Sequence, residues 1–347
     1  MRALVVGAGI GGSTAALALS AAGWDVTVHE AHPKLAGSGP GAFLTLAPNG
    51  LLALEQVGAA SVARSVGFEL STLALLDASG FEVAVRPMGE FRCLLWIELV
   101  AALHREVRQR GIPVLHDRRV ESVSGREADV VVGADGLWST LRRAIDPARP
   151  RYTGQRVFFG YTPGAVSVAG VSAAPGRFTI IRGSASVFGY TVSPSGVAYW
   201  FARVTDALGS DESPGYLLDR LRPDATPAAG LAAASGGRIR VTDAYDLPGV
   251  RRWRAGRLLL LGDAAHAAAP ATGQGASMAM EDAVILAKAL RDSDDVDAAL
   301  ALYERVRRPR VEANTEASAR STAGSAPGPG VETDIAAQLD WGRRLGG

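Results

Sequence analysis

The chain has 347 residues, with 36 lysines and arginines against 35 aspartates and glutamates and a single cysteine, Cys93. This length suggests two domains, and the even charge gives no field that would attract nucleic acid or an anionic membrane, so we expect neither as a partner. One cysteine excludes an internal disulfide framework and a cysteine-based metal cluster, and no stretch is long enough without charge to span a membrane, so we expect a soluble cytoplasmic protein.

The first 30 residues carry the strongest local pattern. An apolar run, Ala3–Val6, predicts a buried strand, and glycines in the order G-x-G-x-x-G then lead into a predicted helix over Ser13–Ala22. The first glycine permits a tight turn, the second lets the backbone approach a pyrophosphate, and the third allows close packing of helix on strand. A second strand, Val26–His29, ends at Glu30, whose carboxylate is placed to bond both hydroxyls of an adenosine ribose. These residues predict a dinucleotide site formed by Gly7, Gly9, Gly12 and Glu30.

The next part of the chain predicts helices and a hairpin. A helical stretch covers Gly50–Val57. Two alternating runs, Leu73–Leu76 and Phe81–Val85, flank an Asp-Ala-Ser-Gly turn and predict a hairpin. A helix over Ile97–Arg110 has apolar residues on one face, and a short strand follows at Val114–Leu115.

Residues 128–136 read ADVVVGADG and predict a buried strand that runs into a turn. The carboxylate of Asp135 lies at the end of that strand, and a helix begins within the next few residues. Open parallel sheets bind their ligands at this position, so Asp135 is a candidate ligand-binding residue.

The character of the chain changes to all-β between Arg156 and Val204. We expect strands at Phe178–Ile181, Val187–Val192 and Val197–Val204. Nine aromatic residues gather here: Phe158, Phe159, Tyr161, Phe178, Phe188, Tyr190, Tyr199, Trp200 and Phe201. One face of this antiparallel sheet is expected to line a substrate cavity, although for any single ring a place in the core is the better interpretation.

Two short helices, Pro214–Leu221 and Ala228–Ala234, and a return strand over Arg238–Tyr245 complete the β-rich region. A buried strand, Arg257–Leu261, then ends in Gly-Asp-Ala-Ala-His, and the sequence Gly-Gln-Gly at 273–275 opens a helix. A helix start of this kind presents backbone N–H groups to a negative centre.

A polar, arginine-rich helix is predicted over Asp297–Ser321, and the glycine-, proline- and serine-rich residues Ser321–Val331 are expected to be flexible.

Three motifs now stand in order along the chain: GAGIGG with Glu30, ADVVVGADG, and GDAAHAAAPATGQGASMAMEDA at residues 262–283. In this combination the chain resembles the single-component FAD-dependent aromatic hydroxylases, the flavoprotein monooxygenases similar to para-hydroxybenzoate hydroxylase. The fold class that we expect is α/β, with a Rossmann-like FAD-binding domain and an antiparallel β-sheet substrate domain. We expect residues 1–70, 90–150 and 245–320 in the first, 71–89 and 151–244 in the second, and 321–347 as a C-terminal tail.

The resemblance implies which residues hold FAD. The glycine motif and Glu30 would hold the ADP half, Asp263 would bond the ribityl or ribose-phosphate part, and Asp135 would serve both FAD and the nicotinamide donor. Pro270 and Gly273-Gln274-Gly275 would lie along the isoalloxazine edge, where backbone N–H groups stabilise negative charge on the reduced ring. The full set of expected cofactor-binding residues is Gly7, Gly9, Gly11, Gly12, Glu30, Lys34, Val120, Asp135, Gly262, Asp263, Pro270, Gly273, Gln274, Gly275 and Ala276.

The chain departs from the family pattern at three places. Ser277 stands where the family commonly has asparagine, and Trp96 stands where it often has arginine. Losing that arginine removes a potential FAD phosphate contact, for which Lys34 or Arg92 would compensate. The segment Glu121–Glu127 is much shorter than the β-meander usual there.

The resemblance also implies an activity. NADH or NADPH would reduce FAD, molecular oxygen would add to form a flavin hydroperoxide, and its terminal OH would pass to an electron-rich aromatic or polyketide-like small molecule. Only one glycine fingerprint is present, so the nicotinamide donor has no second Rossmann domain of its own, and the choice between NADH and NADPH stays open.

No catalytic residue is identified from the sequence. His266 is better interpreted as a structural histidine beside the flavin loop than as an acid or base, and Glu281 and Asp282 are expected to tie a helix to that loop. The remaining histidines have no metal-ligand spacing, so no metal site is expected, and Cys93 is interpreted as a small buried residue.

Other functions stay open beside the monooxygenase. A family member could use FAD in a non-oxygenating cyclisation, isomerisation or other redox reaction, and the substitution at Trp96 and the shortened segment keep this alternative alive. A halogenase is disfavoured because no Trp-x-Trp-x-Ile-Pro motif is present, and a noncatalytic FAD-binding module is the weakest hypothesis. We expect a monomer or a homodimer.

Overall fold

The computed structural model describes residues 1–34, 41–123, 128–236, 238–324 and 334–345 and divides into two compact units. Unit 1 comprises Met1–Gly67, Leu94–Arg151 and Tyr245–Gly347, and unit 2 comprises Phe68–Cys93 and Tyr152–Ala244. Residues 124–127 of the shortened segment and 325–331 of the glycine- and proline-rich stretch lie outside the described residues. No helix in the described ranges combines the length and apolar character needed to cross a bilayer.

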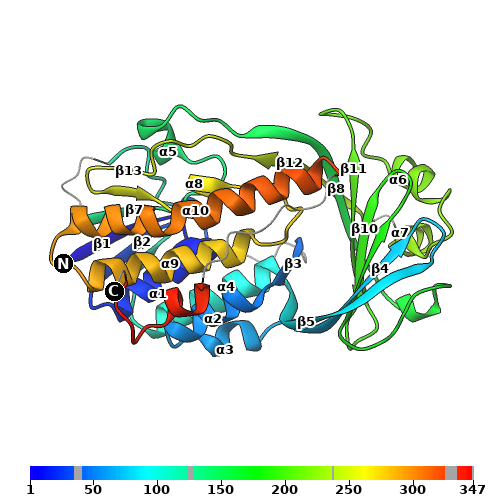
Figure 1. Cartoon of the computed structure of the whole chain (residues 1–347), viewed down its shortest axis with the longest axis horizontal. Coiled ribbons are helices and arrows are strands. Elements are labelled where there is room, and N and C mark those ends of the chain that lie inside the picture. The colour runs from blue at the N-terminus through cyan, green and yellow to red at the C-terminus, as the bar shows by residue number, and fades with distance from the viewer. Residues whose placement is uncertain (35–40, 124–127, 237, 325–333, 346–347) are drawn as a thin grey trace. The chain divides into compact units, whose positions relative to one another are not determined.

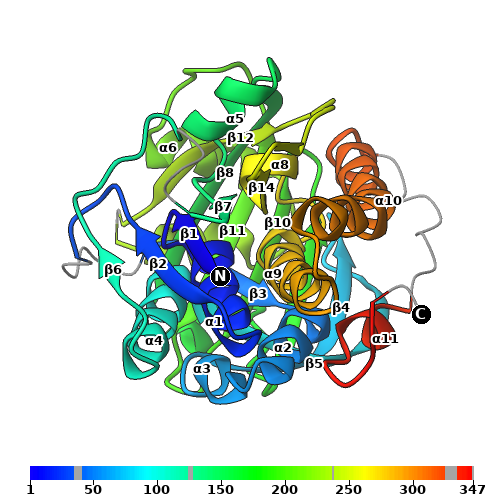
Figure 2. The same cartoon turned by 90° about the vertical axis from the view of Figure 1, so that its left-hand side faces the viewer.

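Unit 1 is built on a sheet with the strand order β13-β14-β7-β1-β2-β6. Its strands are β1 (Arg2–Val6), β2 (Asp25–His29), β6 (Val114–Leu115), β7 (Val130–Gly133), β13 (Arg254–Ala255) and β14 (Leu258–Leu260). All neighbours run parallel except β13 and β14, which pair antiparallel. Figure 2 shows the parallel strands side by side with α1 next to them. Parallel strands need crossover connections, which explains why helices or long segments separate them in the sequence.

The helices of unit 1 are α1 (Ile10–Ala21), α2 (Pro48–Gln56), α3 (Ala60–Arg64), α4 (Trp96–Gln109), α5 (Thr140–Ile145), α8 (Asp263–His266), α9 (Gly275–Arg291), α10 (Val296–Thr322) and α11 (Ile335–Leu339). A short strand, β3 (Phe43–Leu46), precedes α2. Helix α9 is buried from Ser277 to Leu290, and α10 lies alongside it (Figure 1).

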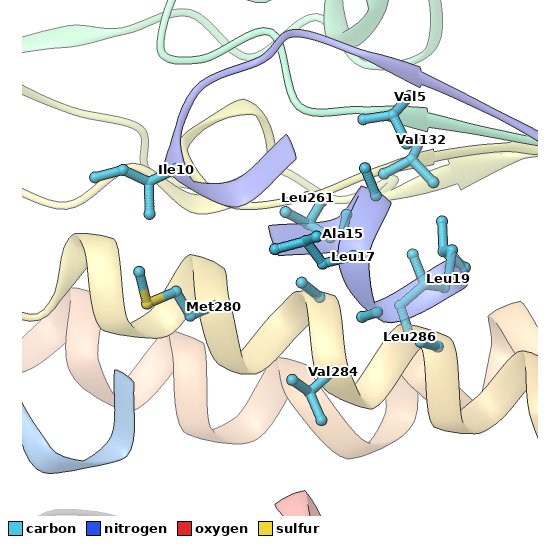
Figure 3. Packing of buried hydrophobic residues seen from close by; sticks show 14 of the residues in the cluster. Val5, Ile10, Ala15, Leu17, Leu19, Val132, Leu261, Met280, Val284 and Leu286 are labelled. Carbon is cyan, nitrogen blue, oxygen red and sulfur yellow. The ribbon is translucent and has the colours of Figure 1, made fainter. Parts of the chain in front are cut away.

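Helix α1 packs closely against α9. Its small and apolar residues are buried on every side, which is the pattern of a helix inside a core. Figure 3 shows Leu19 of α1 and Leu286 of α9 in the layer between the two helices. At the start of α1, a Cβ on Gly11 would lie 3.2 Å from the Cβ of Ala279, so glycine permits this close approach.

Unit 2 is built on a sheet with the order β12-β8-β11-β10-β9-β4-β5. Its strands are β4 (Phe68–Asp77), β5 (Glu82–Leu95), β8 (Arg151–Thr162), β9 (Arg177–Arg182), β10 (Val187–Val192), β11 (Ala198–Thr205) and β12 (Arg240–Asp246). The predicted hairpin is present as β4 and β5, but both strands are longer than the sequence pattern indicated. The helices are α6 (Pro214–Leu221) and α7 (Ala228–Ala234), with a 3₁₀ turn at Ala165–Ser167.

The sheet of unit 2 is not purely antiparallel, because β4 and β9 run parallel. The chain between them is a long crossover through β5 and unit 1, which is the connection that a parallel pair requires. The expectation of an antiparallel sheet therefore holds for the neighbouring pairs β4–β5, β9–β10, β10–β11 and β8–β11.

The aromatic residues of unit 2 divide between the two faces of its sheet. One face is core, where four rings pack with apolar side chains of α6 and α7: Phe158, Phe188, Tyr190 and Trp200. Phe178 is also buried. The alternate positions carry partly exposed rings, Phe159, Tyr161, Tyr199 and Phe201, which the strand register places opposite one another. The core interpretation is thus correct for the first group, while the second group forms an accessible aromatic face.

Candidate functional site

The sequence motifs converge because they follow neighbouring parallel strands. Val6 pairs in register with Gly133, which in turn pairs with Leu260, so the chain leaves three adjacent strands at the same edge of the sheet. Carboxyl ends of parallel strands are the ligand-binding edge of open α/β sheets. Together with the end of β2, this edge carries Gly7, Glu30, Asp135 and Asp263.

The glycines of the first motif have different structural roles. Gly7 has φ +101°, and a Cβ there would lie 2.4 Å from the Ala134 carbonyl oxygen. A Cβ on Gly12 would lie 1.9 Å from the carbonyl oxygen of Gly7, so both positions are closed to any side chain. A Cβ on Gly9 would meet nothing within 4 Å. Gly9 therefore borders open space, whereas Gly7 and Gly12 let strand, turn and helix approach one another.

A cavity of about 600 Å³ lies at this edge of unit 1, and we call it the nucleotide cavity. It brings together five residues that the sequence predicted, which are Gly7, Gly9, Glu30, Val120 and Asp135. Gly11 and Gly12 lie in the packed helix start and are not among its lining residues. Sequence reasoning did not assign a cofactor role to six other lining residues: Trp96, His104, His116, Arg118, Arg119 and Trp138.

Glu30 is held by backbone N–H groups on both carboxylate oxygens. Oε2 accepts a hydrogen bond from the N–H of Ala8 at 2.7 Å, and Oε1 accepts one from the N–H of His32 at 2.8 Å. These bonds orient the carboxylate at the end of β2, within the lining of the cavity. Each oxygen retains further acceptor capacity, so the expected bonds to ribose hydroxyls are compatible with this arrangement.

Asp135 has one satisfied oxygen and one orphaned oxygen. Its Oδ2 accepts hydrogen bonds from the backbone N–H groups of Thr140 (2.8 Å) and Leu141 (3.2 Å) at the start of α5. Its Oδ1 is buried and has no hydrogen-bond partner among the described residues. A buried acceptor without a donor is unfavourable, so this oxygen is suited to a hydroxyl of a bound ligand. The residues present therefore fit the adenosine diphosphate half of FAD.

The cations at the cavity differ from those expected to replace the family arginine at position 96. Trp96 lines the cavity and is 41% exposed. Lys34 is exposed and is not among the lining residues, and Arg92 is buried in unit 2, where it pairs with Glu69 at 3.2 Å. The guanidinium groups that the structure brings to the cavity belong instead to Arg118 and Arg119. They are the available countercharge for a diphosphate.

Two histidines that line the cavity, His29 and His104, have pKa values below the ordinary value for histidine. The buried Nε2–H of His104 donates to the Ala8 carbonyl oxygen at 2.7 Å, which ties α4 to the glycine loop. Burial lowers the pKa of His104. Burial, and then the charge of Arg118, lower the pKa of His29. Both imidazoles are therefore neutral at pH 7.

We expect this pair to make the protein less stable in mild acid. The folded state binds their protons less readily than the unfolded chain, so the free energy of unfolding falls as the pH drops below about 6.5, by up to about 1.4 kcal/mol per pH unit for each proton. A His104→Gln variant keeps an N–H donor and should show a shallower fall between pH 7 and 5 in denaturant titrations. His32→Gln, at an exposed position, is the matched control, and an equal flattening in it would contradict the prediction.

Arg142 joins two of the motif loops. Its NH2 donates to the Leu137 carbonyl oxygen at 2.6 Å, and its NH1 donates to the Ala264 carbonyl oxygen at 2.9 Å. The side chain is 1% exposed. It fixes the Asp135 loop against the Asp263 loop, a role that no local sequence pattern indicated because the two loops are more than 120 residues apart.

The third motif forms a more open surface. Gly262 has φ +60°, and the next residue, Asp263, is exposed at the start of α8. Pro270, Gly273 and Gly275 are exposed, while Gln274 and Ala276 are half-buried, just before and at the start of α9. The side-chain amide of Gln274 accepts a hydrogen bond from Asn49. These positions match those expected along a flavin edge, and their contacts with FAD stay a prediction.

A network of buried charged side chains is hydrogen-bonded to the Gly262 loop of this surface. The Oδ2 of Asp282 contacts His266 Nε2 at 2.6 Å and accepts the N–H of Gly262 at 3.1 Å, while its Oδ1 accepts Arg307 Nε at 2.7 Å. Burial alone would raise the pKa of Asp282, but the charges of His266 and Arg307 hold it at about 2. Asp282 therefore ties α9 to the Gly262 loop, as the sequence predicted.

Glu281 continues the network on the same helix. It is fully buried and pairs with Arg307 at 2.7 Å and with Arg310 at 2.7 Å. Asn49 donates to it at 2.6 Å. Glu281, Asp282 and His266 thus act as structural groups here, in agreement with the sequence interpretation.

The remaining sequence expectations concern metals, cysteine and Ser277. The described residues contain no group of histidine, cysteine and carboxylate side chains able to hold a metal ion. Cys93 is free and buried, and burial raises the pKa of its thiol. Ser277 is buried against α2, where a Cβ on Gly50 would lie 2.7 Å from its Oγ, and its Oγ accepts a hydrogen bond from the N–H of Ala47 at 3.2 Å.

Comparisons with known proteins agree with this geometry. A family model described as an FAD binding domain matches residues 100–318, and one described as an NAD(P)-binding Rossmann-like domain matches residues 5–42. Aurachin C monooxygenase/isomerase of Stigmatella aurantiaca is 31% identical over 88% of this chain and 85% of its own length. The 2-heptyl-3-hydroxy-4(1H)-quinolone synthase of Mycobacteroides abscessus is 32% identical over 94% of this chain and 91% of its own.

A solved structure is similar over nearly the whole chain. HpxO of Klebsiella pneumoniae, complexed with FAD and uric acid, superposes with a TM-score of 0.82 and 27% identity. The superposition covers 93% of this chain and 88% of that one.

Proposed function

The chain belongs to the FAD-dependent aromatic hydroxylases and is an FAD-dependent monooxygenase, and from this premise we propose that its substrate is a planar aromatic molecule that carries a negative charge. The observation that supports this charge is a guanidinium on the accessible aromatic face of unit 2, two of whose nitrogens are buried without an acceptor among the described residues. An aromatic substrate agrees with the expectation from the sequence, and the negative charge makes that expected substrate class more specific.

The proposed cofactor contacts lie in unit 1, whose residues line the nucleotide cavity. Gly9, Glu30 and the free oxygen of Asp135 would hold the adenosine diphosphate half, with Arg118 and Arg119 as countercharge. When bound, FAD takes up electrons from NADH or NADPH and uses molecular oxygen to place a hydroxyl group on the substrate. The backbone N–H groups at the start of α9 would stabilise negative charge on the ring, while the network below holds this surface rigid.

Arg203 is the charged group on the aromatic face. It lies on β11 in alternation with Tyr199 and Phe201, and its guanidinium carbon is 5.7 Å from the Phe201 ring centroid. Phe201 lies over Gly189, where a Cβ would be 2.4 Å from the ring, so this face keeps the space for an aromatic layer.

Two of the three guanidinium nitrogens of Arg203 have no acceptor among the described residues. Its Nε and NH1 are buried, and no described residue accepts a hydrogen bond from them. Burial lowers the pKa of Arg203, which reflects the cost of holding a charge there without a partner. Such a cost is retained where a ligand supplies the missing acceptor. A carboxylate, enolate or phenolate oxygen on an aromatic ring has the required charge. Uric acid, the ligand in the similar structure of HpxO, is a planar acidic heterocycle.

Replacing Arg203 should weaken substrate binding without lowering the stability of the protein. An Arg203→Gln variant should raise the KM for an anionic substrate by about 10- to 100-fold, because hydrogen bonds to charged groups contribute about 1.5–3 kcal/mol. Its melting temperature without substrate should be unchanged or higher, since an unpaired buried charge has been removed. Arg182→Gln, which removes an exposed arginine from β9, two strands away from β11 in the sheet, should change neither quantity. Equal effects in both variants, or a lower melting temperature in Arg203→Gln alone, would contradict the assignment.

The proposed activity is tested with the FAD-loaded protein and a panel of aromatic acids, phenols and acidic heterocycles. The substrate should accelerate anaerobic reduction of the flavin by NADH or NADPH. When isotope-labelled O₂ is then admitted, the substrate should gain one labelled oxygen atom. Conversion of the ligand without oxygen uptake would instead support the non-oxygenating alternative. Preference for uncharged ligands over their acidic analogues would refute the proposed substrate class.

A further inference from the structure

Strand β5 lies at the edge of the unit 2 sheet over most of its length. Besides β4, its only neighbour among the described strands is β3, which has 4 residues. The N–H of Trp96 donates to the Ala42 carbonyl oxygen at 2.9 Å, so β3 lies beside the last residues of β5. On the side away from β4, residues 82–91 therefore have no neighbouring strand in the part of the chain that the structure describes.

This open edge begins with exposed apolar residues at every second position. Phe81 is 69% exposed, Val83 is 61% exposed and Val85 is 48% exposed. A β-bulge leaves Val83 without an opposite residue on β4. An edge strand offers unpaired N–H and C=O groups to another chain, and folded proteins usually cover or charge an edge that is long and apolar. This edge is therefore suited to a partner strand.

The stretch available for pairing is short, and both of its ends are defined. The turn that includes Gly80, with φ +80°, precedes it. Pro87 follows it and has no N–H to donate. Proline is tolerated in a strand where its nitrogen faces away from the neighbouring strand, so Pro87 ends any ladder on the outer side of β5. Between these ends lies Glu82–Arg86, with Ala84 at its centre.

Charges of opposite sign stand at the two ends of this stretch. Arg86 is exposed and has no carboxylate partner among the described residues. Glu82 pairs through its Oε2 with Arg177, while no described residue donates a hydrogen bond to its Oε1. Opposite charges that face each other across an antiparallel pair of strands are stabilising, and like charges are destabilising. The charges therefore favour a partner strand with the reverse order of signs, which a second copy of β5 provides when it runs antiparallel.

One antiparallel alignment of two copies matches all of these side chains. When the strands are centred on Ala84, Glu82 of each copy lies opposite Arg86 of the other, and Val83 lies opposite Val85. A shift by one residue places a charged side chain opposite an apolar one. A shift by two residues places one charged residue opposite Ala84 and the other outside the stretch. The sequence of this edge is therefore complementary to itself in a single register.

We propose that two copies of this chain form a symmetric dimer in which their β5 strands pair antiparallel about Ala84. The interface is isologous, so each ion pair between Glu82 and Arg86 occurs twice. Phe81 and the two valines of both copies lose contact with water on pairing, which favours association. Because the ladder is short, the dimer is weak, with a Kd of about 1–100 µM. This assembly does not depend on the substrate class proposed above.

The first experiment measures the mass of the FAD-loaded full-length protein by analytical ultracentrifugation, from about 1 to 300 µM, a range that brackets this Kd. The wild type should pass from monomer to dimer. Arg86→Glu should raise the Kd about tenfold or more, because symmetry turns two ion pairs into two like-charge contacts. Val85→Lys should do the same by placing a charge in the apolar contact. Arg105→Glu, which makes the first charge change at an exposed position on α4, is the control and should leave the Kd unchanged.

A mixing experiment tests the register. Arg86→Glu and Glu82→Arg should each be monomeric alone, whereas an equimolar mixture should form a heterodimer, since both positions again carry opposite charges. Glu82→Arg also loses its pair with Arg177, so its melting temperature is measured separately. Recovery of association in the mixture depends on the second chain and is not expected from a loss of folding.

Cross-linking tests the two-fold axis. Opposite residues of antiparallel strands have Cα atoms about 4.5–5.5 Å apart, within the range of a disulfide. Ala84→Cys should therefore form a covalent dimer under mild oxidation, while the natural Cys93 is buried. Glu90→Cys, at an exposed position on the same strand, is the control. Its two copies would lie about 40 Å apart along the paired strands and should not cross-link.

Three outcomes would overturn the proposal. The first is a wild type that stays monomeric at every concentration. The second is a dimer whose Kd is unchanged in both Arg86→Glu and Val85→Lys, which would place the interface on another surface. The third is equal cross-linking of Ala84→Cys and Glu90→Cys, which would indicate random collision instead of a defined register.

Discussion

A Gly12→Ala variant should lose both thermal stability and FAD. The added Cβ would lie 1.9 Å from the carbonyl oxygen of Gly7, and the neighbouring Ala134 Cβ would be 3.2 Å away. The first neighbour is a backbone atom and the second follows directly after β7, so α1 would have to move away from the sheet. Overpacking at such a site costs about 3 kcal/mol or more. We expect the melting temperature of the cofactor-free protein to fall by about 5–10 °C and the purified variant to retain no flavin absorbance.

Gly9→Ala is the matched variant, which should weaken FAD binding without lowering the stability of the fold. Gly9 has φ −69° and ψ −167°, which alanine adopts readily, and its Cβ would meet nothing within 4 Å. The melting temperature without cofactor should therefore stay within about 1 °C of wild type. If the diphosphate of FAD approaches the backbone here, the new methyl group should weaken FAD binding by about 10- to 100-fold, equivalent to about 1.4–2.8 kcal/mol. Normal FAD affinity in Gly9→Ala would show that the diphosphate does not pass this residue.

These two glycines show how far the sequence could predict the site. The order G-x-G-x-x-G gives each glycine its local role, and the strand that precedes each motif shows that Gly7, Asp135 and Asp263 all follow strand ends. Parallel pairing then brings such ends together. Local patterns therefore predicted the α/β fold and the residues that follow its strand ends, while their contacts with FAD stay a prediction.

Other site residues arise from contacts between distant segments. His104 reaches the Ala8 carbonyl oxygen across 96 positions, and Arg142 reaches Ala264 across 122. Arg118 and Arg119 lie in a segment with no motif, and their place at the cavity depends on the pairing of β2 with β6. The sequence shows that Lys34 and Arg92 are cations, but it carries no information on where their long side chains lie.

Arg203 shows a further limit of sequence patterns. In the strand pattern it occupies an ordinary polar position beside buried Ala202 and Val204. What distinguishes it is that no described residue accepts a hydrogen bond from its buried Nε and NH1, and this depends on all the segments that surround it. Unsatisfied groups are therefore a functional signal that only three-dimensional structure reveals.

The second large effect is expected from Arg307→Met. Arg307, Glu281 and Asp282 are all fully buried, and this arginine is the only cation that contacts both carboxylates among the described residues. Its removal leaves two adjacent negative charges in the core. Breaking a buried pair in this way costs about 3–5 kcal/mol, which should appear as a large fall in the free energy of unfolding measured in denaturant. Arg310→Met is the control, because that side chain is 18% exposed and therefore better hydrated than Arg307, so its cost should be smaller although it also pairs with Glu281.

The dependence on pH distinguishes this mechanism from a simple loss of packing. With a folded pKa of about 2, Asp282 contributes stability that is present above the unfolded value near 4 and is lost as the pH falls through about 2. Without Arg307 the folded pKa should rise, so Arg307→Met should lose less stability than wild type between pH 4 and 2. Adding Asp282→Asn should then restore part of the stability of Arg307→Met at pH 7, since the amide no longer needs a counterion. If the second substitution instead adds its full cost to the first, the two side chains are independent and packing alone explains the loss. Because Asp282 also accepts the N–H of Gly262, a positive coupling would link the buried charges directly to the loop expected to hold FAD.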